Sequence, residues 1–254
     1  MTLREIFWQS IPATRVGVFS GRIKCPCEVQ FWNMLEKFFQ ACPELCRRDG
    51  SEKTLVDLGC GPGIKSLTLA LTGAQVIGFD TRESSIRHAQ ENARQIQAQY
   101  PQKTFRSQYF CKDIEQGIPE ISDSSVDFVL FVEVIEHLVH YHDVLTEIRR
   151  ILKPDGRVFI TTPNKTFHHK DHDEHVYGEK AYGHVREFDL EELVIAVEQA
   201  GLAILYKGYM NTRASTFLCR WIHPWMIRDH GFLQRKEHIE DVIGIRTLGF
   251  LQPL

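Results

Sequence analysis

Three ionisable residues follow directly after a long apolar run. The segment Val126–Val132 is almost wholly apolar and predicts a buried strand, and the pattern Glu133-x-x-Glu136-His137 comes straight after it. Side chains at the carboxyl end of such a strand lie where α/β sheets bind their ligands. Carboxylates can hold a substrate hydroxyl there, and an imidazole can accept its proton. The spacing therefore predicts a catalytic site at Glu133, Glu136 and His137.

A second feature with chemical meaning is a turn that has glycine at every second position. The strand predicted over Thr54–Leu58 runs into Gly59-Cys60-Gly61-Pro62-Gly63, and helical spacing begins at Lys65. Glycine has no Cβ and tolerates positive φ, so the backbone N–H groups of this turn can face a ligand at a helix N-terminus. A dinucleotide fingerprint needs its third glycine three residues beyond the second, whereas here it is two beyond. The turn thus predicts a cofactor with polar oxygens and disfavours a nicotinamide dehydrogenase.

An acid downstream of the turn supports a cofactor site. The strand predicted over 75–79 ends in Asp80, close to the separation expected when a carboxylate accepts hydrogen bonds from ribose hydroxyls. Asp80 could instead cap the helix predicted over 83–97. Because the glycine turn and the acid occur in the expected order, the ribose role is favoured.

Taken together, these motifs resemble those of the class I S-adenosylmethionine (SAM) dependent methyltransferases. The stretch D-x-G-C-G-P-G from Asp57 resembles motif I, Lys112-Asp113-Ile114 follows the third strand where a family acid meets the adenine amino group, and 152–156 resembles the family's L-K-P-G-G turn. The resemblance covers roughly residues 53–207 and implies SAM as the cofactor. Arg82 departs from the family pattern, in which a Ser or Thr is common two positions after the acid. We therefore expect Arg82 to change the contacts at the ribose edge. The cofactor-binding residues that the resemblance implies are Asp57, Gly59, Gly61, Gly63, Asp80, Asp113, Ile114 and Glu133.

The E-x-x-E-H pattern occurs in several branches of that superfamily. It resembles the pattern of the ubiquinone-biosynthesis O-methyltransferases and of the small-RNA 3′-terminal 2′-O-methyltransferases, where the two Glu and the His bind a metal with a second, later His. The segment His184–Asp189 resembles the histidine-led entry to the sixth helix in both branches. The histidines between 168 and 175 are predicted to lie in a solvated loop. The predicted catalytic residues are therefore His137, Glu133, Glu136 and His184.

The same four residues allow two chemistries. Carboxylates and imidazoles that converge on one point suit Mg²⁺, Mn²⁺ or Zn²⁺. Convergence requires that the chain turn at Glu133 and begin a helical turn there, since Glu133 and Glu136 are three residues apart. In the competing interpretation, His137 is a general base that a carboxylate orients, Glu133 lies near the methionine end of SAM, and no metal is needed. The base is favoured, because the charge balance does not support RNA and the histidine spacing is not diagnostic.

The pattern along the rest of the chain predicts an α/β fold. Strands and helices alternate, which favours a mostly parallel, Rossmann-like class I methyltransferase sheet with helices on both faces. The expected domains are an N-terminal helical cap (1–50), a SAM-binding core (51–210), and a lid with the final strand (211–254). The remaining predicted elements are strands at 105–111, 157–162 and 203–207, helices at 141–152 and 190–200, an apolar helix face at 31–39, and an antiparallel edge strand at 243–251.

Composition limits the class of protein. The 254 residues carry a formal net charge of −3, so there is no overall nucleic-acid footprint. Seven scattered cysteines suit free thiols in a reducing compartment, and no stretch is apolar enough for a membrane span or a signal peptide. The expectation is a cytoplasmic protein. Residues 211–236 interleave aromatic and basic side chains, which predicts a substrate lid or, as the alternative, a peripheral membrane contact.

The function predicted from all of this is an enzyme that uses SAM to methylate an oxygen of a small molecule, lipid precursor or glycan. The alternatives are a metal-dependent RNA 2′-O-methyltransferase and a catalytically silent SAM-binding protein. A broadly basic surface would favour the RNA enzyme, and the near-neutral chain lacks that feature. The acidic and histidine residues at the expected methyl site argue against a silent protein.

Overall fold

The computed structural model describes residues 35, 53–102, 106–165, 184–210 and 246–253. The strands are β1 (Thr54–Leu58), β2 (Gln75–Asp80), β3 (Ser107–Cys111), β4 (Val126–Val132), β5 (Leu152–Pro163), β6 (Leu202–Met210) and β7 (Arg246–Pro253). The helices are α3 (Ile64–Ala70), α4 (Glu83–Gln99), α5 (Tyr141–Ile151) and α8 (Leu190–Gln199), with 3-10 turns η2 (Ile114–Gln116) and η3 (Ile135–His137). The alternation of strands and helices that the sequence predicts is confirmed.

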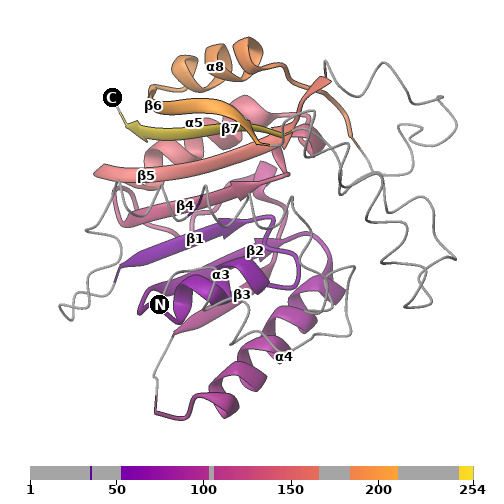
Figure 1. Cartoon of the computed structure of the whole chain (residues 1–254), viewed down its shortest axis with the longest axis vertical. Coiled ribbons are helices and arrows are strands. Elements are labelled where there is room, and N and C mark those ends of the chain that lie inside the picture. Colours follow the sequence, from indigo (N-terminus) through magenta and orange to yellow (C-terminus); the bar gives the residue numbers. More distant parts are fainter. Residues whose placement is uncertain (1–34, 36–52, 103–105, 166–183, 211–245, 254) are drawn as a thin grey trace, which may run out of the picture.

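These strands form one seven-stranded sheet in the order β3-β2-β1-β4-β5-β7-β6 (Figure 1). Strands β1 to β5 pair in parallel, and their carboxyl ends meet at one edge. The predicted final strand is antiparallel as expected, but its position at the sheet edge was wrong. β7 pairs with both β5 and β6, so β6 forms the edge. The crossover through α8 places β6 two strand positions from β5, and β7 lies between them.

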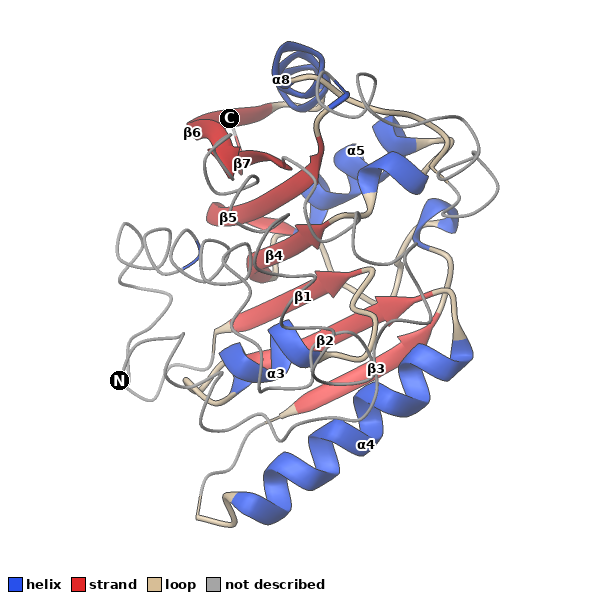
Figure 2. Cartoon of the chain, turned by 45° about the vertical axis from the view of Figure 1, so that its right-hand side comes forward, coloured by secondary structure: helices blue, strands red, loops and turns tan. Residues whose placement is uncertain are grey.

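Helices cover both faces of the sheet, as Figure 2 shows. One core contains side chains of α3 and α4 together with Phe159 of β5. The other contains side chains of α5 and α8 together with Ile160 of β5. Because successive residues of a strand point to opposite faces, this one strand contributes to both cores. The Rossmann-like fold with helices on both faces is therefore confirmed.

Most of the predicted N-terminal and C-terminal units lies outside the described residues. Of the helix predicted over 31–39, only Leu35 is described; it is helical and fully buried in the core beside α3 and α4. The predicted lid (211–236) and the histidine-rich segment (168–175) are not described. None of the described helices has the length and apolar character needed to cross a bilayer.

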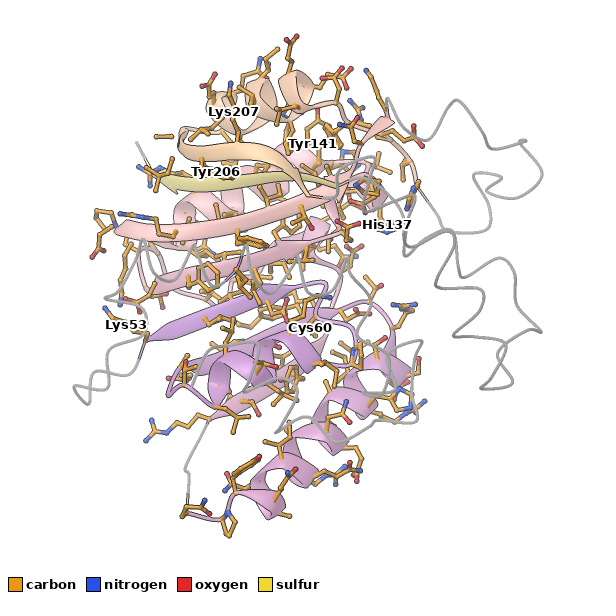
Figure 3. The ribbon with its side chains drawn as sticks, viewed as in Figure 1. Lys53, Cys60, His137, Tyr141, Tyr206 and Lys207 are labelled. Carbon is orange, nitrogen blue, oxygen red and sulfur yellow. The ribbon has the colours of Figure 1, made fainter. Side chains whose placement is uncertain are left out.

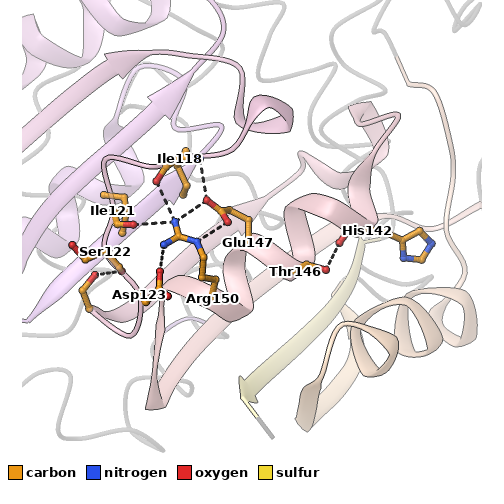
Figure 4. A network of polar contacts seen from close by, with 9 residues as sticks. Ile118, Ile121, Ser122, Asp123, His142, Thr146, Glu147 and Arg150 are labelled. Carbon is orange, nitrogen blue, oxygen red and sulfur yellow. Dashed lines mark hydrogen bonds and ion pairs between the residues drawn. The ribbon is translucent and has the colours of Figure 1, made fainter.

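A polar network fixes the loop before β4 onto α5 (Figure 4). Arg150 donates to both carboxylate oxygens of Glu147 at 2.7 Å and to the Ile121 carbonyl at 2.9 Å, and it also pairs with Asp123. Glu147 in turn accepts the Ile118 N–H at 3.0 Å. The Arg150 guanidinium holds the pKa of Glu147 below its usual value. This network orients the helix that follows the predicted catalytic segment.

The amino ends of the central strands meet at a buried acid. Asp127 of β4 accepts hydrogen bonds from Lys153 at 2.8 Å, from the Thr54 N–H at 2.9 Å and from Lys53 at 3.1 Å. Burial alone would raise the pKa of Asp127, but these donors outweigh it and the pKa is lowered. Lys53 lies at the end of the sheet opposite His137 (Figure 3), so this cluster is separate from the predicted site.

Candidate functional site

The glycine turn joins β1 to α3 in the conformation that its sequence requires. Gly59, Gly61 and Gly63 have φ values of 74°, 52° and 73°, a region that residues with a Cβ adopt at a cost. The Gly59 and Cys60 N–H groups both donate to the Phe79 carbonyl, at 2.8 and 2.9 Å. A Cβ on Gly59 would lie 2.3 Å from a methyl of Val134. The turn is therefore fixed to the end of β2 and packed against the segment that follows β4.

Asp80 lies at the carboxyl end of β2 and faces this turn. Its Oδ2 accepts the Gly61 N–H at 2.9 Å, and its Oδ1 accepts the Arg82 N–H at 2.9 Å. The predicted alternative, a side-chain cap on α4, is not seen, because Arg82 is the N-cap residue and no side-chain hydrogen bond caps the helix. The Arg82 side chain also pairs with Oδ1 of Asp80, at 3.6 Å. A carboxylate has about four lone-pair sites, so Asp80 retains capacity to accept from hydroxyl donors. This geometry fits the predicted ribose contact.

Asp57 lies beneath the turn and is 4% exposed. Burial raises the pKa of Asp57 to about 6, and the nearby Asp80 adds to the rise, whereas the Ser66 hydroxyl and the Lys65 charge lower it. A buried carboxyl with a perturbed pKa at the carboxyl edge of a parallel sheet is typical of a functional site.

Tyr109 of β3 also lies beneath the glycine turn, and the sequence analysis did not predict it. A Cβ on Gly63 would lie 2.9 Å from the Tyr109 hydroxyl, and one on Gly78 would lie 2.5 Å from its ring. Glycine at both positions therefore makes room for this side chain. The only signal in the sequence was a glycine inside the predicted strand over 75–79, which marks a close approach.

Asp113 and Ile114 follow β3 next to Asp80. The Lys112 N–H donates to the Asp80 carbonyl at 2.9 Å. Asp113 begins the turn η2, with its Oδ1 accepting the Glu115 N–H at 3.0 Å, and Ile114 is buried. The structure thus brings the predicted ribose acid and the predicted adenine acid to adjacent strand ends.

The chain turns sharply at Glu133, as a shared site requires. Glu133 has a φ of 57°, which is uncommon for a residue with a side chain, and its N–H donates to the Thr161 carbonyl at 2.9 Å. The turn η3 begins two residues later. Left-handed backbone of this kind is costly and is concentrated at functional sites.

Three of the four predicted catalytic residues converge. Glu136, His137 and His184 each place one donor atom within 4.8 Å of the others, and the two imidazole rings lie 4.8 Å apart in an edge-to-face arrangement. The Glu136 side chain is 1% exposed, and its Oε1 lies 3.9 Å from Nε2 of His137, which is 37% exposed. The Glu136 carbonyl accepts the N–H groups of Val185 and Arg186 at 2.8 and 3.1 Å, which brings His184 to the site.

Glu133 is not part of this group. Its Oε1 accepts the Thr161 hydroxyl at 2.7 Å, whereas Oε2 of Glu136 accepts the Thr162 hydroxyl at 3.0 Å. The interpretation that all four residues share one ligand is therefore not supported by the geometry. Both threonines are fully buried at the end of β5, and sequence reasoning missed them.

Comparison with known proteins agrees with these features. The model of a family described as "Methyltransferase domain" matches residues 33–207. The mouse protein named ubiquinone biosynthesis O-methyltransferase, mitochondrial, is 35% identical over 112 residues, which is 44% of this chain and 29% of that protein. The Idiomarina loihiensis ubiquinone biosynthesis O-methyltransferase is 33% identical over 117 residues, 44% of this chain and 43% of the relative. The chain thus spans less than half the length of these relatives.

A solved structure extends the likeness beyond those segments. The magnesium protoporphyrin IX methyltransferase of Synechocystis PCC 6803, solved with bound S-adenosylhomocysteine (SAH), superposes with a TM-score of 0.61 at 16% identity and covers 99% of this chain and 92% of its own. At that identity the likeness shows the fold alone. The family match covers well over half of the chain, and with the glycine turn, Asp80 and the parallel sheet it shows that this protein belongs to the class I SAM-dependent methyltransferase superfamily.

Proposed function

We propose that the protein transfers the methyl group of SAM to a hydroxyl oxygen of a small molecule. The observation that carries the proposal is the group of Glu136, His137 and His184, placed one turn beyond the segment that packs against the glycine turn. A half-exposed imidazole beside a buried carboxylate is the arrangement that a general base needs. The ubiquinone-biosynthesis relatives support an oxygen acceptor.

The residues would act as follows. When bound, SAM would supply an electrophilic methyl group that an acceptor oxygen could attack in line, with S-adenosylhomocysteine as the leaving group. His137 takes the hydroxyl proton, and Glu136 orients the imidazole and balances its charge. Asp80 and the glycine turn hold the donor, while Asp113 and Ile114 hold its adenine. The protein contributes mainly alignment, which can supply a large part of the rate enhancement.

The same three donors favour a second candidate mechanism, in which a divalent cation lowers the pKa of the acceptor hydroxyl. A site with three protein ligands and an open position is typical of catalytic metals. Glu136, His137 and His184 could supply the three ligands without Glu133. The base mechanism and the metal mechanism therefore differ in what His137 binds.

Chelation distinguishes the two mechanisms. On the base mechanism, activity survives a chelator, and His137→Ala lowers kcat about a hundredfold or more, because a positioned base is removed. His142→Ala is a matched control, since its exposed imidazole lies on α5 outside the group of three. Chelator-sensitive activity that Mn²⁺ or Mg²⁺ restores would contradict the base mechanism.

The acceptor is identified by incubating the protein with labelled SAM and fractionated extracts. A lipid-soluble labelled product would support a lipid precursor such as a quinone-ring intermediate, which the names of the relatives favour, and a labelled sugar would support a glycan. Labelled RNA would favour the 2′-O-methylation alternative, and SAM binding with no product would favour the silent protein. Peripheral membrane contact through 211–236 remains a prediction.

A further inference from the structure

The end of β5 places two consecutive threonines against the two acids of the E-x-x-E-H motif. Thr161 donates to Glu133 at 2.7 Å, and Thr162 donates to Glu136 at 3.0 Å. Both threonines are fully buried, and so is Glu136. A hydrogen bond to an ionised carboxylate is about twice as strong as a neutral one, so these contacts fix where each acid points.

The two threonines that donate to these acids lie on opposite faces of the sheet. Side chains along a strand alternate between faces, and the pairing of β5 with β4 and β7 is regular at this end. Thr161 shares its face with Phe159, which packs in the core of α3 and α4, and Thr162 shares its face with Ile160, which packs in the core of α5 and α8. Glu133 is thus hydrogen-bonded to the threonine on the face of α3 and α4, and Glu136 to the threonine on the face of α5 and α8.

We infer that Thr161 and Thr162 are positioning residues that divide the motif into two functions. Thr161 orients Glu133 to bind the cofactor. Thr162 orients Glu136 beside His137, which takes the proton of the acceptor hydroxyl. The left-handed backbone at Glu133 bends the chain at the first of the two acids, and η3 begins two residues later. The inference rests on the proposed function and on the cofactor role that the family resemblance implies for Glu133.

The division of roles is tested by a double-mutant cycle that needs no acceptor. Calorimetry measures the dissociation constant of SAH for the full chain, for Thr161→Val, for Glu133→Ala and for the double variant. Thr161→Val should raise the dissociation constant about threefold to tenfold and Glu133→Ala about tenfold, as expected for charge-assisted hydrogen bonds. The double variant should bind no more weakly than Glu133→Ala alone, because Thr161 acts only through Glu133.

The matched control is the other threonine, which differs only in the face that it serves. Thr162→Val and Glu136→Ala should leave the SAH dissociation constant within about twofold of wild type, and their effects on the urea midpoint of unfolding should be coupled, since they share one contact. Thr161→Ser and Thr162→Ser keep the hydroxyl, so both should show the wild-type SAH dissociation constant and urea midpoint. These variants keep the test decisive if a valine variant folds poorly.

Two results would overturn the inference. The first is that the effects of Thr161→Val and Glu133→Ala on SAH affinity are additive. The second is that Thr162→Val lowers SAH affinity as much as Thr161→Val does. If wild type binds SAH normally and either result appears, only the division of roles fails. A wild-type protein that binds no SAH would instead refute the proposed function.

Discussion

Two buried aspartates at opposite ends of the central strands have pKa values that move in opposite directions. Asp127, at the amino end of β4, and Asp57, near the carboxyl end of β1, are both 4% exposed. Asp127 has two lysines and a backbone N–H as donors, and its pKa is lowered. Burial dominates at Asp57, and its pKa rises to about 6. At the same solvent exposure, the acid with two lysine partners has a lowered pKa, and the more deeply buried acid at the predicted ligand-binding edge has a raised pKa.

The largest effect that we expect from this contrast between Asp127 and Asp57 is the loss of stability in Asp127→Ala. This substitution removes the acceptor of three donors, and we expect the free energy of unfolding to fall by about 2–3 kcal/mol, less than for fully buried pairs because Lys53 and Lys153 can reach water. Because the folded pKa of Asp127 is lowered, its contribution is present above the unfolded value and is lost as the pH falls below about 4. Urea unfolding measures the change.

The SAH affinity of the folded Asp127→Ala protein should stay at the wild-type value, because the cluster lies at the end of the sheet opposite the site. Asp155→Ala, which removes an exposed acid near the same end, is the control and should change stability by less than about 0.5 kcal/mol. A destabilisation no larger than that control would show that the cluster has no structural role.

The converse test is Asp57→Asn, which removes the charge and keeps the shape. A raised folded pKa means that the contribution of Asp57 to stability is present below about pH 4 and is lost as the pH rises through about 6. The stability of Asp57→Asn relative to wild type should therefore increase by about 1–2 kcal/mol between pH 5 and 7.5. Unfolding of both proteins at the two pH values gives this difference, and a constant difference would mean that burial does not perturb Asp57.

A third test concerns the ligand that the carboxyl end is expected to bind. Asp80→Ala should weaken SAM binding by about tenfold or more, because ribose hydroxyls lose a charged acceptor and Gly61 loses its side-chain partner. Asp80→Asn keeps one oxygen acceptor and should lie between wild type and Asp80→Ala. Calorimetry with SAM, SAH and NAD decides the matter: binding of NAD without SAM would contradict the assignment of the cofactor.

Several features of this protein depend on local spacing and could be predicted from the amino-acid sequence. The glycine turn with Asp80 and the alternation of strands and helices followed from short segments, because glycine φ angles and side-chain periodicity act within a few residues. The family followed from the resemblance of these motifs to known ones. The end of the apolar run at Val132 is also compatible with a turn at Glu133. These features required no knowledge of which strands are neighbours.

The grouping of the predicted catalytic residues depends on long-range packing. Glu133 and Glu136 are three apart in sequence, yet Thr161 and Thr162 separate them, because β4 and β5 are neighbours in a register that no local pattern encodes. His184 reaches His137 through backbone hydrogen bonds to Glu136 from a segment nearly fifty residues away. Two further features depend on long-range packing: β7 lies between β5 and β6, and the Tyr109 side chain lies beneath Gly63. Long-range pairings of this kind are set by the whole core, so spacing along the chain cannot reveal them.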